Sequence, residues 1–278
     1  MTLKELTDRT SLKAIGREIG LDVFMMEGHL QCVPLDAADP RYSTDLTLPS
    51  WPMVDACRTD DHPLFHPWIE AGLLTNEQMR HACQRYHLGQ TKSGQPLFWM
   101  IDNLQHPLDA HIGSSCWLSQ LLKSREPLIQ SWRVTHCLFG QHLLMTNTPS
   151  PYSPPYGGKA TDRRALLGNG ALCLVESEPS ALILSELFPD ALWMAYVTIP
   201  HLTPNLFAPL EGHTVTIYPR TDPTGSTLLF FQNLAAHVTQ CYPAITITVD
   251  PLLELHATPD QKRRNIDLAD YLLESSPP

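Results

Sequence analysis

Three acidic side chains lie at or just beyond the ends of predicted strands. Residues 172–175 are continuously apolar and lie between a Gly-Asn-Gly turn and a polar turn, which predicts a short buried strand ending at Glu176. Another predicted strand, 214–218, is soon followed by Asp222, and Asp250 comes just after a further one. Parallel strands align their carboxyl ends at one edge of a sheet, where carboxylates can hold Mg²⁺. We therefore expect a magnesium site formed by Glu176 and Asp222, with Asp250 as a further candidate and Glu176 as the catalytic group.

Each of these acids also has a structural interpretation. Glu176 can simply cap the helix that follows its strand, because a carboxylate is favourable at a helix N-terminus. Asp222 begins an Asp-Pro-Thr-Gly sequence, which is favourable for a β-turn. Asp267 and Asp270, near the end of the chain, have the spacing of helix-capping residues. The sequence leaves both the metal-binding and the structural interpretation open for Glu176 and Asp222. It favours helix capping for Asp267 and Asp270.

The elements that must position these side chains alternate between strand and helix from residue 171 onward. Such alternation is typical of a parallel sheet with helices on its faces. We expect strands at 172–175, 193–198, 214–218 and 245–249 and helices at 179–188, 226–240 and 265–273. The fold class predicted for residues 159–278 is therefore α/β, with a mostly parallel sheet flanked by helices.

The preceding part of the chain has a different pattern. Thr75 and Gln78 have the spacing of a capping box, which predicts a helix from about 76 to 86. Two bulky apolar segments, 97–102 and 108–112, predict a β-hairpin. We expect an α+β subdomain over residues 62–158.

The first 61 residues form the third predicted region. A helix is expected within 4–20 and a hairpin over 21–33, around Glu27 and Gly28. The many prolines and aspartates of residues 34–67, with little periodicity, predict an irregular arm.

Composition restricts the classes of function. The chain has 278 residues, a formal net charge of −10 and seven scattered cysteines without a Cys-x-x-Cys pair, which argues against a disulfide framework or a zinc ribbon. An acidic chain is poorly suited to tight, nonspecific binding of nucleic acid, so any such contact must be local. No apolar run is long enough to span a bilayer and the first residues lack a signal-peptide pattern, so we expect no membrane partner and a cytoplasmic location.

Several motifs together carry a resemblance to a known family. Two motifs resemble the Toprim fold of bacterial DnaG-type primases, topoisomerases and related nucleases. They are Val175-Glu176 before a helix and a strand followed by Asp222-x-x-Gly225. In the Toprim fold, a Glu and an Asp-x-Asp pair bind metal. The order of motifs is most similar to an uncharacterised primase-like family found on mobile elements of Bacteroidota, over about residues 62–274. The motifs that carry this similarity are Tyr86-His-Leu-Gly89, Phe98-Trp-Met-Ile-Asp102, Cys137-Leu-Phe-Gly140-Gln-His-Leu-Leu144, Val175-Glu-Ser-Glu178 and Asp267-Leu-Ala-Asp270-Tyr-Leu272.

The chain departs from the Toprim pattern at the metal-binding motif. The family sequence Asp-x-Asp-x-x-Gly aligns with Arg220-Thr-Asp222-Pro-Thr-Gly225, so an arginine replaces the first aspartate. A fixed positive charge repels a metal ion where a carboxylate would attract it. The glycine that usually follows the Toprim glutamate is Ser177. We expect one bound Mg²⁺ or none.

The resemblance implies a primase-like protein of a mobile genetic element that binds nucleic acid or nucleotide through a degenerate metal site, with weak or no catalysis. Its implied partners are single-stranded nucleic acid or nucleotides and a replication or mobilisation protein. Two alternatives stay open: an active magnesium-dependent nucleotidyltransferase or nuclease in which Glu176 is the general acid/base, and an inert protein-interaction module. The candidate phosphate contacts are Lys159, Arg163, Arg164 and Arg220.

Overall fold

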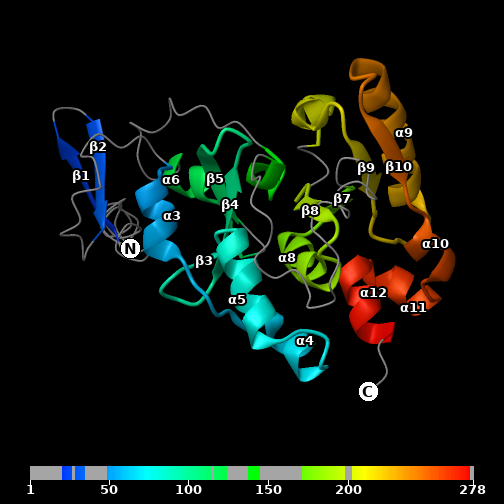
Figure 1. Cartoon of the computed structure of the whole chain (residues 1–278), viewed down its shortest axis with the longest axis horizontal. Coiled ribbons are helices and arrows are strands. Elements are labelled where there is room, and N and C mark those ends of the chain that lie inside the picture. The colour runs from blue at the N-terminus through cyan, green and yellow to red at the C-terminus, as the bar shows by residue number, and fades with distance from the viewer. Residues whose placement is uncertain are drawn as a thin grey trace, which may run out of the picture. The chain divides into compact units, whose positions relative to one another are not determined.

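The protein has two compact units, and their helices and strands are shown in Figure 1. The computed structural model describes residues 21–26, 29–34, 49–113, 116–123, 137–144, 171–197 and 202–275. The first unit consists of Met1–Pro63 and Arg80–Cys137, and the second consists of Leu64–Met79 and Leu138–Pro278. The division falls within two helical elements, η1 (Pro63–Phe65) and α5 (Asn76–Arg85).

The first unit contains an antiparallel sheet of order β3-β4-β5-β6. The predicted hairpin over 97–112 is confirmed as β4 and β5. The Asp102 carboxylate stabilises the connecting turn, because it accepts hydrogen bonds from the Leu104 amide at 2.9 Å and the His106 amide at 2.8 Å. The predicted N-terminal hairpin is confirmed as the antiparallel pair β1 and β2. The elements of this unit are β1 (Leu21–Met26), β2 (His29–Pro34), α3 (Trp51–Cys57), β3 (Gly89–Gln90), β4 (Pro96–Ile101), β5 (Pro107–Ile112), β6 (Cys116–Trp117) and α6 (Leu118–Lys123).

The prediction of an irregular arm over 34–67 is wrong for α3, which occupies residues in the middle of it. Ser50 precedes this helix with an extended backbone, and Pro52 lies in its first turn, where a missing N–H costs nothing. The helix buries Met53, Val54 and Cys57. Its seven residues make only two turns, too few for a helical period to emerge from the surrounding prolines.

The predicted helix over 76–86 is confirmed as α5, and its capping box forms as expected. The Gln78 amide nitrogen donates to the Thr75 hydroxyl at 3.2 Å, and the Thr75 amide nitrogen donates to the Gln78 side-chain oxygen at 3.0 Å. Two amide groups that the helix itself leaves without acceptors are thereby satisfied. Two short elements precede α5, η1 (Pro63–Phe65) and α4 (His66–Glu70).

A parallel sheet of order β10-β9-β7-β8 forms the centre of the second unit, as the sequence predicts. All four strands run in the same direction, and helices connect β7 to β8 and β9 to β10. The elements are η3 (Gln141–Leu144), β7 (Leu172–Val175), α8 (Glu178–Leu187), β8 (Leu192–Ala195), η5 (Pro204–Leu210), β9 (Thr214–Ile217), α9 (Ser226–Cys241), β10 (Thr246–Val249), α10 (Leu252–His256), α11 (Pro259–Arg264) and α12 (Leu268–Ser275).

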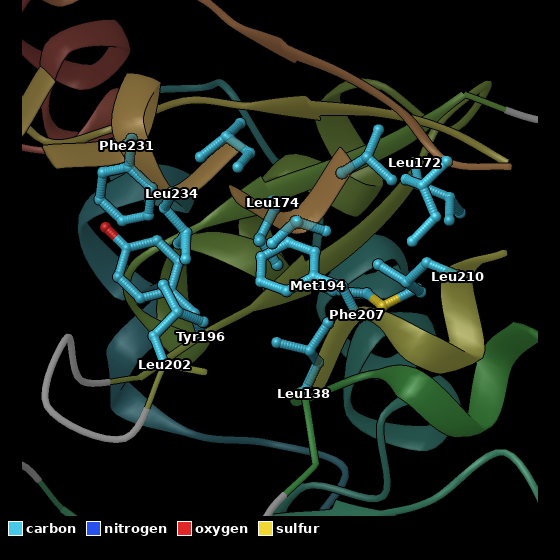
Figure 2. Packing of buried hydrophobic residues seen from close by; sticks show 14 residues of the cluster. Leu138, Leu172, Leu174, Met194, Tyr196, Leu202, Phe207, Leu210, Phe231 and Leu234 are labelled. Atoms are coloured by element: carbon cyan, nitrogen blue, oxygen red, sulfur yellow. The ribbon is translucent and has the colours of Figure 1, made fainter. Parts of the chain in front are cut away.

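The core of this unit lies between the sheet and α9 (Figure 2). Alternate strand residues such as Leu172, Leu174 and Met194 point to one face and pack with Phe207 of η5 and Phe231 of α9. All four residues of β7 are buried, so the opposite face of that strand is also covered. A strand buried on both faces must be apolar throughout, which is why its position could be predicted from sequence.

The strand order contains a reversal between β7 and β9. From β7 the chain crosses to β8 on one side, whereas from β9 it crosses to β10 on the other side. Right-handed crossovers in opposite directions place their helices on opposite faces of the sheet. The loops at the carboxyl ends of the two adjacent strands therefore diverge, and ligands of open α/β sheets commonly bind in the resulting crevice.

Candidate functional site

Glu176 and Arg220 form an ion pair at this reversal. Glu176 directly follows β7, and Arg220 lies three residues beyond the end of β9. The Tyr218 amide nitrogen donates to the Leu174 carbonyl at 2.9 Å, which extends the pairing of the two strands up to the loop. The Arg220 Nε lies 2.9 Å from the Glu176 Oε2, and the two side chains are 41% and 16% exposed. Arg220 thus contacts the expected catalytic glutamate directly.

Tyr196 completes this arrangement from the end of β8. Its amide nitrogen donates to the Val175 carbonyl at 3.0 Å, and its hydroxyl donates to the Glu176 Oε2 at 3.4 Å. The ring packs against Phe231 of α9, with 4.9 Å between the ring centroids. The buried tyrosine therefore holds the same carboxylate oxygen that pairs with Arg220.

Opposing effects set the pKa of the Glu176 carboxyl group. Burial has the largest effect and raises the pKa of this carboxyl group. The Arg220 charge and the Tyr196 hydrogen bond lower the pKa, whereas the Asp267 charge raises it. The resulting pKa is above the ordinary value of a glutamate. Burial and the Glu176 charge hold the pKa of Tyr196 well above its usual range. Tyr196 consequently remains a neutral hydrogen-bond donor at physiological pH.

Asp222 has a structural role at the start of α9. Burial raises the pKa of its carboxyl group, but the hydrogen bonds from Thr224 and Thr227 outweigh burial and hold the pKa well below its usual range. Its Oδ1 accepts from the Thr224 amide at 2.8 Å, the Thr224 hydroxyl at 2.5 Å, the Ser226 amide at 3.3 Å and the Ser226 hydroxyl at 3.2 Å. Its Oδ2 accepts from the Thr227 amide at 2.7 Å. Both oxygens thus satisfy groups at the N-terminus of α9 that the helix leaves without acceptors.

Asp250 acts in a similar way at the next strand end. Its amide nitrogen donates to the Ile217 carbonyl at 2.9 Å, and its Oδ1 accepts from the Leu252 amide at 2.9 Å, at the start of α10.

The residues present do not fit a magnesium site in this arrangement. In the described ranges, no three acidic, histidine or cysteine side chains are close enough to hold a metal ion together. The Glu176 Oε2 contacts a guanidinium group, and both oxygens of Asp222 accept hydrogen bonds from α9. The structure therefore does not bring Glu176, Asp222 and Asp250 together as ligands. The structure does not describe three of the candidate phosphate contacts, which are Lys159, Arg163 and Arg164.

Two contributors to the site were not identified from sequence. Tyr196 follows β8 just as Glu176 follows β7, so the same strand-end argument could have found it. Asp267 could be predicted only as a cap, and it does accept a hydrogen bond from the Asp270 amide at 3.0 Å. It also accepts one from the Ser177 hydroxyl at 2.9 Å, across a separation of 90 residues that sequence spacing cannot indicate.

The fold and the site define a class of protein: an α/β unit with a parallel sheet and an arginine–glutamate pair at its strand-order reversal. Residues 166–221 match a family described as a domain of unknown function (DUF6371). The matched segment includes both members of the ion pair. No curated protein and no solved structure matches the chain. Among the helices in the described residues, none has the length and apolar character needed to cross a membrane.

Proposed function

We propose that the chain is a primase-like Toprim protein of a mobile genetic element that binds the phosphate groups of single-stranded nucleic acid or of a nucleotide, with weak or no catalysis. The proposed phosphate contact is Arg220. The observation that carries the proposal is the 2.9 Å contact between the Arg220 Nε and the Glu176 Oε2 at the strand-order reversal between β7 and β9.

The geometry of the ion pair supports phosphate binding. Glu176 engages the Nε of the guanidinium, and within the described residues this is the one ion-pairing contact of Arg220. The two terminal nitrogens can therefore donate to a ligand while the Nε stays fixed. Arginine is well suited to this task because its planar fork donates two parallel hydrogen bonds to one phosphate. An exposed fraction of 41% leaves the side chain accessible to such a ligand.

The same contacts support weak or absent catalysis. A divalent metal at Glu176 would have to displace the guanidinium and would then experience its repulsion. A metal at Asp222 would have to replace hydrogen bonds that hold the first turn of α9. In this proposal the arginine supplies the positive charge that a metal supplies in an active Toprim site.

The proposal is consistent with the acidic composition of the chain. A net charge of −10 opposes nonspecific binding to nucleic acid, but a single arginine at the strand-order reversal acts locally. One phosphate contact to a single strand predicts a weak salt dependence, with a slope of log affinity against log salt of roughly −0.7.

Fluorescence anisotropy with a labelled oligo-dT strand, in EDTA and at several salt concentrations, tests the proposal. Arg220→Gln should weaken binding roughly 10- to 100-fold, because hydrogen bonds to a charged group are lost. Arg58→Gln is a matched control, since Arg58 is 40% exposed and also pairs with a carboxylate, that of Asp55 at 3.1 Å. Competition by ATP distinguishes a nucleotide site from one that needs a strand. Equal binding by the wild type and Arg220→Gln would refute the proposed site.

A primer-synthesis assay separates this proposal from an active enzyme. Purified protein, Mn²⁺, a single-stranded template and nucleoside triphosphates should give little or no product. Metal-dependent product that disappears in Glu176→Gln would favour a magnesium-dependent nucleotidyltransferase instead.

A further inference from the structure

The turn between α11 and α12 is bonded to the loops that follow both β7 and β9. The Thr221 amide, next to Arg220, donates to the Ile266 carbonyl at 3.1 Å. The following residue, Asp267, accepts a hydrogen bond from the hydroxyl of Ser177, which is next to Glu176. Two successive residues of the turn are thus bonded to the immediate neighbours of the ion pair. The Asp267 carboxylate is thereby held close enough to Glu176 for its charge to act on that side chain.

The Asp267 carboxylate makes contacts that a phosphate could also make. Its Oδ2 accepts from the Ser177 hydroxyl at 2.9 Å and from the Ser180 hydroxyl, in the first turn of α8. Its Oδ1 accepts from the Asp270 amide at 3.0 Å, in the first turn of α12. Hydroxyl groups and helix N-termini favour any anion, whether it is a carboxylate or a phosphate.

The Asp267 charge also acts on the rest of the site. It raises the pKa of Glu176 and that of Tyr196, in both cases behind the larger effect of burial. An anionic ligand at Arg220 would experience the same repulsion.

We propose that Asp267 is an internal competitor for the anionic ligand of Arg220, so that the turn between α11 and α12 forms an autoinhibitory contact. A ligand phosphate binds Arg220 fully only when this carboxylate is displaced or neutralised. This inference rests on the function proposed above and adds a restraint built into the same site.

Asp267→Asn tests the competitor role, because asparagine keeps the size and the capping ability of the side chain but removes its charge. Asp267→Ser is a second uncharged variant that retains a capping hydroxyl, in case the first folds poorly. Asp260→Asn is the matched control: it removes the same charge from α11, where Asp260 pairs with Arg263 at 3.1 Å and Arg264 at 3.2 Å. Circular dichroism checks that each variant is folded.

The probe is inorganic triphosphate, titrated calorimetrically in EDTA. The expected result is about tenfold tighter binding by Asp267→Asn and Asp267→Ser than by the wild type, with Asp260→Asn unchanged. Unchanged or weaker binding by both Asp267 variants, together with loss of binding in Arg220→Gln, would overturn the competitor role and leave the proposed phosphate site intact. Full binding by Arg220→Gln would overturn the phosphate site and the competitor role with it.

Discussion

At the scale of single residues, Arg220 determines the chemistry at this edge of the sheet because it contacts Glu176 directly. A carboxylate at this position would share a cation with Glu176, whereas a guanidinium is itself the cation that Glu176 binds. Tyr196 reinforces this choice because it donates to the oxygen that the guanidinium contacts. A guanidinium at this position is suited to an anionic ligand.

His87 in the first unit shows a second effect of local environment. Its Nδ1 lies 3.1 Å from the Arg58 Nη2, so the neutral ring accepts a hydrogen bond from the guanidinium. Burial first, and then the Arg58 charge, lower its pKa to about 4, with a smaller opposing effect of Asp55. The ring is therefore neutral in the folded protein down to mildly acidic pH.

The free energy of unfolding should fall as the pH is lowered from about 6.5 towards 4. Between the unfolded pKa of about 6.5 and the lower folded pKa, the unfolded chain binds a proton that the folded chain does not. The contribution of His87 is complete above pH 6.5, and its loss is on the order of 1–3 kcal/mol. Urea unfolding at pH 7 and pH 4.5 measures it.

His87→Asn is the control for this pH dependence. His87 has a φ of 54°, and asparagine tolerates that left-handed conformation but does not titrate. The variant should lose a large part of the acid sensitivity in this range. An identical pH dependence in the wild type and His87→Asn would contradict the assignment.

At the scale of elements, acidic side chains that follow one element accept hydrogen bonds from the first turn of the next helix. Asp222, Asp250 and Asp267 each follow a strand or a turn and each accept amide hydrogen bonds from the helix that comes next. Asp222 and Asp250, which the sequence offers as metal ligands, are thus bonded to the starts of α9 and α10. The Glu176 side chain differs from them because its contacts are with Arg220 and Tyr196.

Asp222→Asn should lower the free energy of unfolding by about 1–2 kcal/mol at pH 7, because one of its two acceptor oxygens becomes an amide nitrogen. The folded pKa of Asp222 lies below the unfolded value of about 3.9, so its stabilisation is present above that pH and is lost as the pH falls below it. The difference between the variant and the wild type should therefore shrink in acid. Guanidinium unfolding at pH 7 and pH 3 measures both effects.

Asp60→Asn is the matched control, since the Asp60 side chain is exposed and accepts a hydrogen bond from Gln84 at 3.3 Å. It should change stability by no more than about 0.5 kcal/mol. If Asp222→Asn were as stable as the wild type at pH 7, Asp222 would not be needed as a cap and would again be a candidate ligand.

At the scale of the whole molecule, the sequence is most informative where burial is continuous. The strand at 172–175 is predicted with the bounds that the structure has, because every residue in it is buried and apolar. The parallel sheet follows from the alternation of strands and helices. In contrast, α3 is short and lies among prolines, so its two turns give no recognisable period.

The site itself is only partly predictable. Strand ends place Glu176, but its contact with Arg220 depends on the register of β7 against β9 and on the path of the loop after β9. Asp267 reaches Ser177 from 90 positions away, which no local pattern indicates. Motif spacing therefore identifies which groups lie at the edge, whereas tertiary contacts decide which of them pair.

The most direct test of the account is a crystal structure grown with Mn²⁺ and a non-hydrolysable nucleoside triphosphate. We predict that the Arg220 Nε stays within hydrogen-bond distance of Glu176 while its terminal nitrogens donate to phosphate oxygens. Anomalous density for Mn²⁺ between Glu176 and Asp222, with the guanidinium turned away, would contradict the account.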